Sequence, residues 1–393
     1  MTVLFVDSVS DVRGGAERSL LELAAALVGR GHAVALAVWR EGDLAAEFSE
    51  LGPVLARGAA ADPASPLGGV TTRAPLLGPV VRAANWLRLG LRPVAGEARW
   101  LDAAIRDTGA TIVHTNCDLS PPAALRAART AGVPLVAHVR DDWRSWFHPR
   151  TARALRSAAV VVAPSAFLAG RFRAHGIDTE VVANPVRGRA FRRDRSAEDR
   201  REIRRGLGLE AGTFAAAVIG RLDEQKGTLR VLEAARKLDG RGDDRVRFLL
   251  AGKGTRPFEA RVRAEVDSLE RSDRVRILGY RTDVPDWLPA MDALVVPSLG
   301  EPFGRMIIEG MHAGLPVLAF RDGAAPEILD HGRTGVLLPA GDAEALADGL
   351  LELAGDAGRA GALGASARDA ARRYEPDAVA GAMERIYEQL AGG

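Results

Sequence analysis

The most restrictive feature of this sequence is an alternation of short apolar runs with longer amphipathic segments. The first run, at residues 3–6, ends at Asp7 and is followed, after a loop with two glycines, by a segment at 16–28 whose apolar residues recur at helical spacing. Similar runs return at 33–38, 111–114, 135–139 and 160–163, with helical patterns between them. Strands separated by helices predict a parallel sheet that is covered by helices on both faces.

A second alternating series begins after a charged stretch. Residues 187–205 are dense in Arg, Asp and Glu, and they follow the turn dipeptide Asn184-Pro185. Apolar runs then return at 214–219, 246–251, 275–278, 293–296, 317–320 and 336–338. We therefore expect an α/β chain with two doubly wound parallel-sheet domains in tandem.

The two series set the expected domain boundaries. The first domain spans 1–186 and the second spans 213–376, with a linker at 187–212. Apolar residues recur at helical spacing over 377–390. We expect the C-terminal helix, 377–393, to pack back on the first domain.

Composition is consistent with two ordinary globular domains. The chain has 393 residues, of which 47% are hydrophobic and 26% charged, and this excludes a disordered or fibrous protein. The 53 basic and 51 acidic residues leave a net charge of +2, too small an excess to indicate nucleic-acid binding. The single cysteine, Cys117, excludes an intramolecular disulfide and a cysteine-based zinc cluster.

Two segments bear on where in the cell the protein is found. The apolar run at 3–6 is too short for a signal peptide, and no uncharged stretch elsewhere reaches the roughly 20 apolar residues of a membrane span, so we expect a cytoplasmic protein. Residues 82–100 interleave four arginines with leucines, Trp86 and Trp100. This pattern allows a peripheral contact with anionic lipid at the inner face of the membrane. We favour the alternative, a surface helix that packs its tryptophans on the first domain.

The second domain contains a basic loop directly after an apolar strand. The loop runs from Gly220 to Gly227 and precedes a helical pattern at 228–238. Arg221 and Lys226 lie five residues apart in it, so both can face one anion such as a diphosphate. The chain has only three lysines, which makes a lysine in this position more informative than ordinary surface charge. The alternative is a solvated loop.

A second candidate segment spans residues 297–310. Glu301 follows a strand, Phe303-Gly304 opens a helix, and Glu309 lies about two turns along that helix between apolar neighbours. The free N–H groups of a helix N-terminus bind phosphate, and carboxylates accept hydrogen bonds from sugar and ribose hydroxyls. The pattern is typical of a site for a polyhydroxylated, phosphorylated ligand.

Together these segments resemble family 4 of the retaining glycosyltransferases, which have the GT-B fold of two doubly wound Rossmann-like domains facing a central cleft. The resemblance is carried by Gly14-Gly15-Ala16-Glu17, 181–186, Gly220-Arg221 to Lys226-Gly227, 251–254, 278–280 and Glu301 to Glu309. The Glu-x7-Glu element with Pro302-Phe303-Gly304 inside it is the most specific. The match covers most of the chain.

The resemblance implies roles around the donor diphosphate. Gly14 and Gly15 let the backbone of the first domain approach the diphosphate and the sugar. Arg221 and Lys226 bind the diphosphate and stabilise its charge as it leaves.

The resemblance also implies contacts to the sugar and nucleoside. Glu301 contacts the hydroxyls of the transferred sugar, and Glu309 binds the ribose hydroxyls. The loop at Tyr280-Arg281 lies along the nucleobase, mostly through its backbone. Backbone N–H groups that assist Glu301 come from Phe303, Gly304, Arg305 and Met306.

The first domain departs from the family pattern. Many members carry His-x-His at the end of the strand that matches 111–114, whereas this chain has His114-Thr115-Asn116. A later family histidine corresponds to Arg140, which shares one face of a strand with His138 by the period of two. We therefore treat His114, Asn116 and His138 as candidate catalytic residues, with a structural role as the alternative for both histidines.

The implied reaction is transfer of a sugar from a nucleotide-diphosphate sugar to a hydroxyl or other nucleophile by a front-face route with retention. We expect UDP or GDP as the nucleotide, no further cofactor, and no metal, since the chain has no Asp-x-Asp pair. The expected acceptor is a small molecule, a glycan or a lipid-linked compound. We expect no nucleic-acid partner.

Two other functional hypotheses compete with the glycosyltransferase. A nicotinamide oxidoreductase requires Gly-x-Gly-x-x-Gly after a first strand, but the first loop has only Gly14-Gly15 and the segment 252–257 lacks the third glycine. A non-catalytic sugar-nucleotide-binding protein remains open, and the missing second histidine at Asn116 is its best support.

Overall fold

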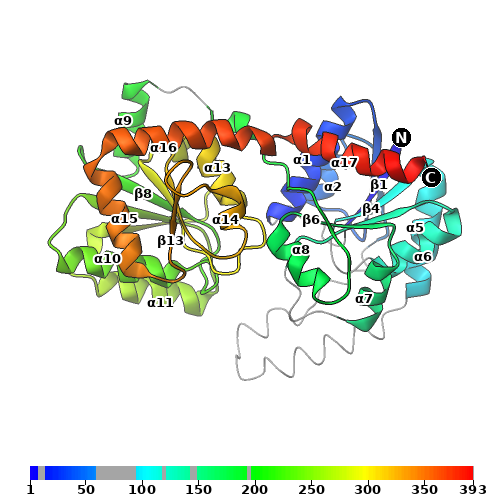
Figure 1. The fold of residues 1–393 in the computed structure, drawn as a ribbon, viewed down its shortest axis with the longest axis horizontal. Helices are drawn as coiled ribbons and strands as arrows, with labels where there is room; N and C mark the ends of the chain where they lie inside the picture. The colour runs from blue at the N-terminus through cyan, green and yellow to red at the C-terminus, as the bar shows by residue number, and fades with distance from the viewer. Residues whose placement is uncertain (8–13, 59–93, 117–120, 142–147, 193–195, 393) are drawn as a thin grey trace. The chain divides into compact units, whose positions relative to one another are not determined.

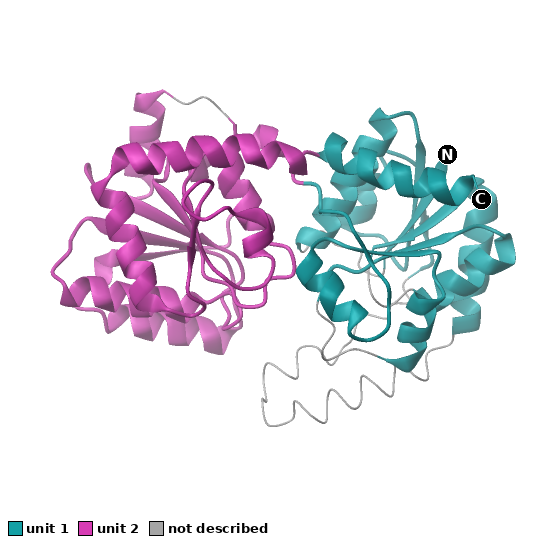
Figure 2. Cartoon of the chain, viewed as in Figure 1, with its two compact units in different colours: residues 1–185, 376–393 teal, residues 186–375 magenta. Residues whose placement is uncertain are grey.

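The computed structural model describes residues 1–7, 14–58, 94–116, 121–141, 148–192 and 196–392. The chain divides into two compact units, coloured separately in Figure 2. Unit 1 consists of residues 1–185 and 376–393, and unit 2 consists of residues 186–375. The two units are described separately.

Unit 1 is built on a parallel sheet of seven strands in the order β3-β2-β1-β4-β5-β6-β7. The strands are β1 (Thr2–Asp7), β2 (Ala33–Val38), β3 (Val54–Ala56), β4 (Ile112–Thr115), β5 (Leu135–His138), β6 (Val160–Ala163) and β7 (Glu180–Val181). All neighbouring strands pair in parallel. The order reverses between β1 and β4, and such a switch point is where open α/β sheets bind ligands at the carboxyl ends of their strands.

Helices cover both faces of this sheet because alternate strand residues are apolar on each side. Among the described residues the helices are α1 (Gly15–Gly29), α2 (Asp43–Phe48), α5 (Val94–Thr108), α6 (Pro121–Ala131), α7 (Pro149–Arg156), α8 (Ala166–Arg173) and the C-terminal α17 (Pro376–Ala391). One face packs against α1, α2 and α17. The other packs against α5 and α6, and further along against α7 and α8.

Helix α17 returns to unit 1 and lies beside α1 (Figure 1). Its Met383 and Tyr387 are fully buried in the core cluster that contains Phe5 and Leu23. At the rim, Arg30 of the chain after α1 forms an ion pair of 2.6 Å with Glu384. Apolar burial therefore holds α17 in place, and the partly exposed ion pair adds little.

Unit 2 has a parallel sheet of six strands in the order β10-β9-β8-β11-β12-β13. The strands are β8 (Phe214–Ile219), β9 (Val246–Ala251), β10 (Val275–Gly279), β11 (Ala293–Val296), β12 (Val317–Phe320) and β13 (Val336–Leu338). The order again reverses, here between β8 and β11. Loops that follow β8 and β11 are therefore brought side by side.

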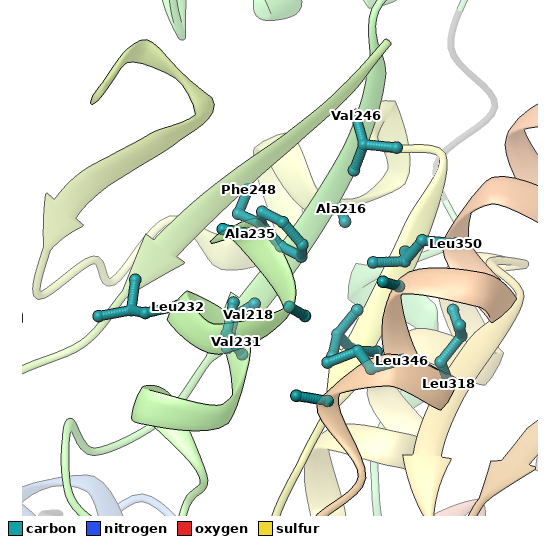
Figure 3. Close-up of a cluster of buried hydrophobic side chains, with 14 of the residues drawn as sticks. Ala216, Val218, Val231, Leu232, Ala235, Val246, Phe248, Leu318, Leu346 and Leu350 are labelled. Carbon is teal, nitrogen blue, oxygen red and sulfur yellow. The ribbon is translucent and has the colours of Figure 1, made fainter. Parts of the chain in front are cut away.

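The helices of unit 2 are α9 (Ala197–Gly206), α10 (Thr228–Gly240), α11 (Arg256–Asp267), α12 (Val284–Trp287), α13 (Arg305–Ala313), α14 (Ala325–Ile328), α15 (Ala343–Gly355) and α16 (Ala357–Ala370). Short 3-10 turns stand at Gly188–Ala190, Ser272–Arg274, Leu288–Ala290 and Ala371–Tyr374. Apolar side chains of α10 and α15 pack on β8, β9 and β12, as Figure 3 shows. The opposite face meets α13, where Gly310 lies so close to Leu294 that a Cβ atom would be 2.4 Å from it.

The structure confirms the strands expected from the apolar runs, each to within two residues, and it also corrects the sequence prediction. Residues 54–56, which no apolar run predicted, form the edge strand β3, and the expected linker at 187–212 lies in unit 2, where residues 197–206 form α9. A capping box explains that helix, because Ser196 and Asp199 satisfy each other's backbone N–H groups. Dense charge is compatible with a helix that has such a cap.

The basic and aromatic segment at 82–100 is only partly described, since residues 82–93 lie outside the described residues. Its last residues belong to α5, where Trp100 packs edge-on against Trp39 with ring centroids 5.5 Å apart. This contact matches the interpretation that Trp100 packs on the first domain. In the described part of the chain, no helix has the length and apolar character that crossing a membrane requires.

Candidate active site

The basic loop of unit 2 follows β8 and is fixed by its own backbone contacts. Asp223 Oδ1 accepts a hydrogen bond of 2.7 Å from the backbone N–H of Lys226. Gly227 ends the loop in the left-handed conformation, with φ of +70°, and a Cβ atom there would lie 1.9 Å from the carbonyl oxygen of Pro297. Only glycine therefore lets the loop after β8 lie directly on the loop after β11.

This close approach places Lys226 against Glu301. Lys226 Nζ lies 2.6 Å from Glu301 Oε2, and both side chains are largely buried. The loops are also joined by a hydrogen bond of 2.8 Å from the backbone N–H of Leu299 to the carbonyl of Gln225. Arg221 is arranged differently: its side chain is 69% exposed and pairs with Asp223 at 3.0 Å. The two cations of the loop therefore contact different carboxylates in this structure.

A third loop, after β12, supports Glu301 from the other side. Asp322 Oδ2 accepts a hydrogen bond of 2.9 Å from the backbone N–H of Gly300, and the carbonyl of Glu301 accepts one of 2.9 Å from Ala324. Gly323 has φ of +61°, and a Cβ atom there would lie 2.4 Å from the backbone nitrogen of Glu301. The position of Glu301 is thus set by backbone contacts with both neighbouring loops.

Helix α13 begins directly after the loop that carries Glu301. Gly304 is its N-cap with φ of +89°, and a glycine has no side chain with which to cap the first turn. Phe303 is buried with its ring edge-on to Tyr374 at 6.1 Å, which fixes the entry of the chain into the helix. One and a half turns further on, Glu309 Oε1 accepts a hydrogen bond of 2.9 Å from Arg305 Nε. The N-terminal N–H groups here, including that of Met306, have the polarity that binds phosphate.

The loop after β10 carries an exposed aromatic ring. Tyr280 is 62% exposed, and Lys253 Nζ from the neighbouring loop lies 5.4 Å from its ring centroid. Arg281 is held by Asp283, with 2.7 Å between Arg281 Nε and Asp283 Oδ1, and this pairing raises the pKa of Arg281. The backbone N–H of Gly252 donates to the carbonyl of Gly279 at 2.8 Å, so these two loops are also tied together.

In unit 1, Gly14 and Gly15 stand where β1 leads into α1. Gly14 is the N-cap of α1, and its N–H donates to Glu17 Oε2 at 2.9 Å. Glu17 is buried, and desolvation, with a smaller effect of Asp7, raises the pKa of its carboxyl group. The carboxylate thus holds the backbone of the glycine pair at the carboxyl end of β1.

A buried polar network connects the carboxyl ends of the unit 1 strands. Asn116 Nδ2 donates to Asp7 Oδ2 at 2.7 Å, and Asn116 Oδ1 accepts from Arg140 Nε at 2.7 Å. Arg140 also donates through Nη1 to the side chain of Asn184. All four residues are at least nine-tenths buried. Asn116 therefore orients Arg140, which is a role that a histidine at that position would fill differently.

The two candidate histidines lie next to this network. His114 Nε2 is 3.3 Å from His138 Nδ1, and His114 Nδ1 is 2.5 Å from the hydroxyl of Tyr387 on α17. Burial, together with the charge of Arg140, lowers the pKa of His114 to about 3 and lowers that of His138 as well. Both imidazoles are therefore neutral near pH 7.

Several members of these clusters were not foreseen. Sequence reasoning used Asn184 only in a turn signal and in the family segment 181–186, and it gave no role in the site to Asp7, Asp223 or Tyr387. Asp7 had a usable signal, since a charged residue that directly ends a buried apolar strand is unusual. Tyr387 had none, because its partner His114 is 273 residues away in the sequence.

Two family models match consecutive parts of the chain. The model described as Glycosyltransferase Family 4 matches residues 13–187, and the one described as Glycosyl transferases group 1 matches residues 214–356. Together they span most of both units. The chain belongs to glycosyltransferase family 4. This confirms the resemblance seen in the motifs, and the matched ranges include both the glycine pair at the start of α1 and the Glu301 to Glu309 element.

Two curated relatives of this family 4 chain are named as a mannosyltransferase and a glycosyltransferase. It is 32% identical over 225 residues to the lipopolysaccharide core biosynthesis mannosyltransferase LpsB of Rhizobium meliloti, covering 55% of this chain and 60% of that protein. It is 31% identical over 230 residues to a D-inositol 3-phosphate glycosyltransferase of Streptomyces bingchenggensis, covering 56% and 50%. The matched region thus spans about half the length of these relatives.

Solved structures confirm the fold of this family 4 chain. HepE of Anabaena, solved in complex with UDP, aligns with a TM-score of 0.80 at 22% identity over 99% of this chain and all of that one. A glycosyltransferase from Rickettsia africae aligns with a TM-score of 0.81 at 20% identity over 99% of this chain and 98% of that one. The two doubly wound units are therefore those of the GT-B fold, as expected from the sequence.

Proposed function

We propose that this protein transfers a sugar from a nucleotide-diphosphate sugar to a hydroxyl or other nucleophile of an acceptor. One observation carries the proposal. Lys226 is paired with Glu301, and Glu301 lies in the loop that leads into the glycine-capped N-terminus of α13. A cation, a carboxylate and a helix N-terminus at one place match a phosphate that is attached to a polyhydroxylated sugar.

The proposed mechanism follows the charge that develops as the glycosidic bond breaks. The anomeric carbon gains oxocarbenium character while negative charge grows on the leaving diphosphate. Lys226 and the N–H groups at the start of α13 stabilise that charge, and Arg221 adds a second cation once a phosphate competes with Asp223 for it. Glu301 contacts the sugar hydroxyls and Glu309 the ribose hydroxyls.

We further propose a retaining, front-face transfer that needs no metal. The acceptor hydroxyl attacks from the face that the phosphate is leaving, and the leaving phosphate oxygen takes its proton. Membership of family 4 supports retention, and the protein cations supply the charge stabilisation that a metal provides elsewhere. Activity that persists in EDTA and a product with the anomeric configuration of the donor would agree with this. A strict Mn²⁺ requirement or an inverted product would contradict it.

For the donor we propose UDP-sugars first and GDP-sugars second. HepE was solved in complex with UDP and in complex with UDP-glucose, which supports a uridine nucleotide, and LpsB is named as a mannosyltransferase. The acceptor is a small molecule, a glycan or a lipid-linked compound. We propose a cytoplasmic protein, with any peripheral contact to anionic membranes made through 82–100, which co-sedimentation with anionic and neutral vesicles tests.

The alternative is a protein that binds sugar nucleotides without turning them over, which the asparagine at position 116 favours. A thermal-shift panel of UDP, GDP, ADP, TDP and CDP identifies the nucleotide, and the corresponding sugar nucleotides are then assayed for hydrolysis and transfer. Release of nucleoside diphosphate supports the transferase. Stabilisation by a nucleotide with no turnover of any matching donor supports the alternative, and no stabilisation at all contradicts both.

A further inference from the structure

Three buried side chains of unit 1 form a linear hydrogen-bonded series. The hydroxyl of Tyr387 lies 2.5 Å from His114 Nδ1, and His114 Nε2 lies 3.3 Å from His138 Nδ1. The last nitrogen of the series, His138 Nε2, is buried and has no hydrogen-bond partner among the described residues. Buried polar atoms without a partner are rare in folded proteins, so this nitrogen requires an explanation.

The protonation of the two rings is constrained by burial. Both imidazoles are buried, and the nearby guanidinium of Arg140 further disfavours a second positive charge. Each ring is therefore neutral and carries one proton, on either Nδ1 or Nε2. The remaining question is which nitrogen of each ring holds it.

The hydroxyl of Tyr387 determines which atom donates in each hydrogen bond of the series. In the described parts of unit 1, its hydroxyl has no other acceptor than His114 Nδ1, and a buried hydroxyl needs one. If the hydroxyl donates, His114 carries its proton on Nε2 and donates to His138 Nδ1, so His138 is protonated at Nε2. The reverse direction leaves both the Tyr387 proton and the lone pair of His138 Nε2 unsatisfied, and is disfavoured.

We infer that Tyr387 and His114 are positioning residues that hold His138 as a neutral Nε2–H donor, and that this N–H binds an oxygen of the substrate. The inference rests on the proposed function for the identity of that oxygen, which belongs either to the transferred sugar or to the acceptor. His138 ends β5, at the edge of the sheet where ligands bind in this class of fold. In this role His138 donates a hydrogen bond and does not act as a base.

The tautomers are tested directly in the ligand-free, full-length protein by ¹⁵N-histidine NMR, with each ring assigned from single histidine variants. We expect both His114 and His138 to show a protonated Nε2 and an unprotonated Nδ1. Tyr387→Phe keeps the packed ring but removes the donor, so both histidines should lose this fixed preference. Tyr374→Phe removes a buried hydroxyl from unit 2 and should leave both spectra unchanged. A proton on Nδ1 of His138, or spectra that Tyr387→Phe does not alter, overturns the inference.

A matched pair of substitutions tests the substrate contact. His138→Gln can place an amide N–H near the position of Nε2, whereas His138→Asn reaches only the position of Nδ1. We expect the Gln variant to retain about tenfold more kcat/KM than the Asn variant, which is the effect of one neutral hydrogen bond. Equal values for the two variants overturn the contact.

Two assays identify the oxygen and separate this inference from the proposed function. A difference between the variants in donor hydrolysis without acceptor assigns the oxygen to the donor sugar, and a difference seen only in transfer assigns it to the acceptor. If no donor is turned over, the proposed function fails. The NMR experiment tests the tautomers independently of turnover. If no donor is turned over, the proposed contact between His138 and a substrate oxygen is overturned.

Discussion

Lys226 Nζ and Glu301 Oε2 lie 2.6 Å apart although the two residues are 75 positions apart in the sequence. The pair exists because β8 and β11 are neighbours in the unit 2 sheet, so the loops that follow them meet at one edge. A lysine that is already paired with a carboxylate is held in one place before any substrate arrives. Such preorganisation is what makes a fixed charge effective in stabilising a leaving group.

Replacing this lysine should affect turnover more than binding. Lys226→Ala removes a cation that acts mainly on charge that develops in the transition state, so we expect kcat to fall by about 10²- to 10³-fold with a smaller change in donor affinity. The measurement is steady-state kinetics with the identified donor, together with a donor binding curve. Lys237→Ala is the matched control, because Lys237 forms an exposed ion pair with Glu344. An unchanged kcat in Lys226→Ala would exclude the proposed role.

The second carboxylate of the motif should control nucleotide binding. Glu309 is largely buried beside Arg305, and a carboxylate that accepts hydrogen bonds from ribose hydroxyls is worth about 1.5–3 kcal/mol. A nucleotide at about 100 times its dissociation constant stabilises a protein by about 2.7 kcal/mol, and Glu309→Ala should lose most of this thermal shift. Glu233→Ala, which breaks an exposed Arg–Glu pair on α10, should keep it. Equal shifts in both variants would argue against the ribose contact.

Alanine substitutions at two glycines with similar backbone conformation distinguish the cost of backbone strain from the cost of a steric clash. Gly323 and Gly332 both have positive φ, +61° and +78°, but only Gly323 lies against the backbone of Glu301. Gly332→Ala should cost about 1–2 kcal/mol of unfolding free energy from the backbone conformation alone. Gly323→Ala should cost about 2 kcal/mol more and should also reduce donor turnover, because Glu301 must move. Urea denaturation of both variants measures the difference, and equal losses would show that the loop adapts.

The buried carboxyl group of Glu17 should give stability a defined pH dependence. Its pKa is raised in the folded protein, mainly by desolvation and then by Asp7, so the folded state binds this proton more tightly than the unfolded state. By linkage, this group lowers stability as pH rises from the unfolded pKa of about 4.3 through the raised folded value. Glu17→Gln removes that penalty and keeps an acceptor for the Gly14 N–H.

The melting temperature of Glu17→Gln should therefore exceed that of the wild type by more at pH 7 than at pH 4. Glu47→Gln serves as the control, since Glu47 is half exposed in its pair with Arg18. A difference that is independent of pH, or larger at pH 4, would contradict the raised pKa.

Much of the secondary structure could be predicted because patterns within short stretches of sequence determine it. A mainly apolar run such as Val246–Ala251, bounded by charged and glycine residues, is predicted as a strand without knowledge of its neighbours in the sheet. The strand Val54–Ala56 was missed because it is three residues long, lies at the sheet edge, and follows a proline. Helix α9 was missed because its cap, Ser196 with Asp199, was hidden in a charged stretch.

The candidate site was predictable only where the sequence itself keeps its members close together. Glu301 and Glu309 are eight residues apart, one in the loop before α13 and the other on the helix, and the motif alone identified both. The Lys226–Glu301 pair and the Tyr387–His114 contact depend on which strands are neighbours and on where the last helix returns. Local periodicity contains no such information, because contacts between distant segments are chosen by the burial of whole sheet faces. The sequence therefore determined the elements and the family, and the tertiary structure alone decided which charges and rings meet.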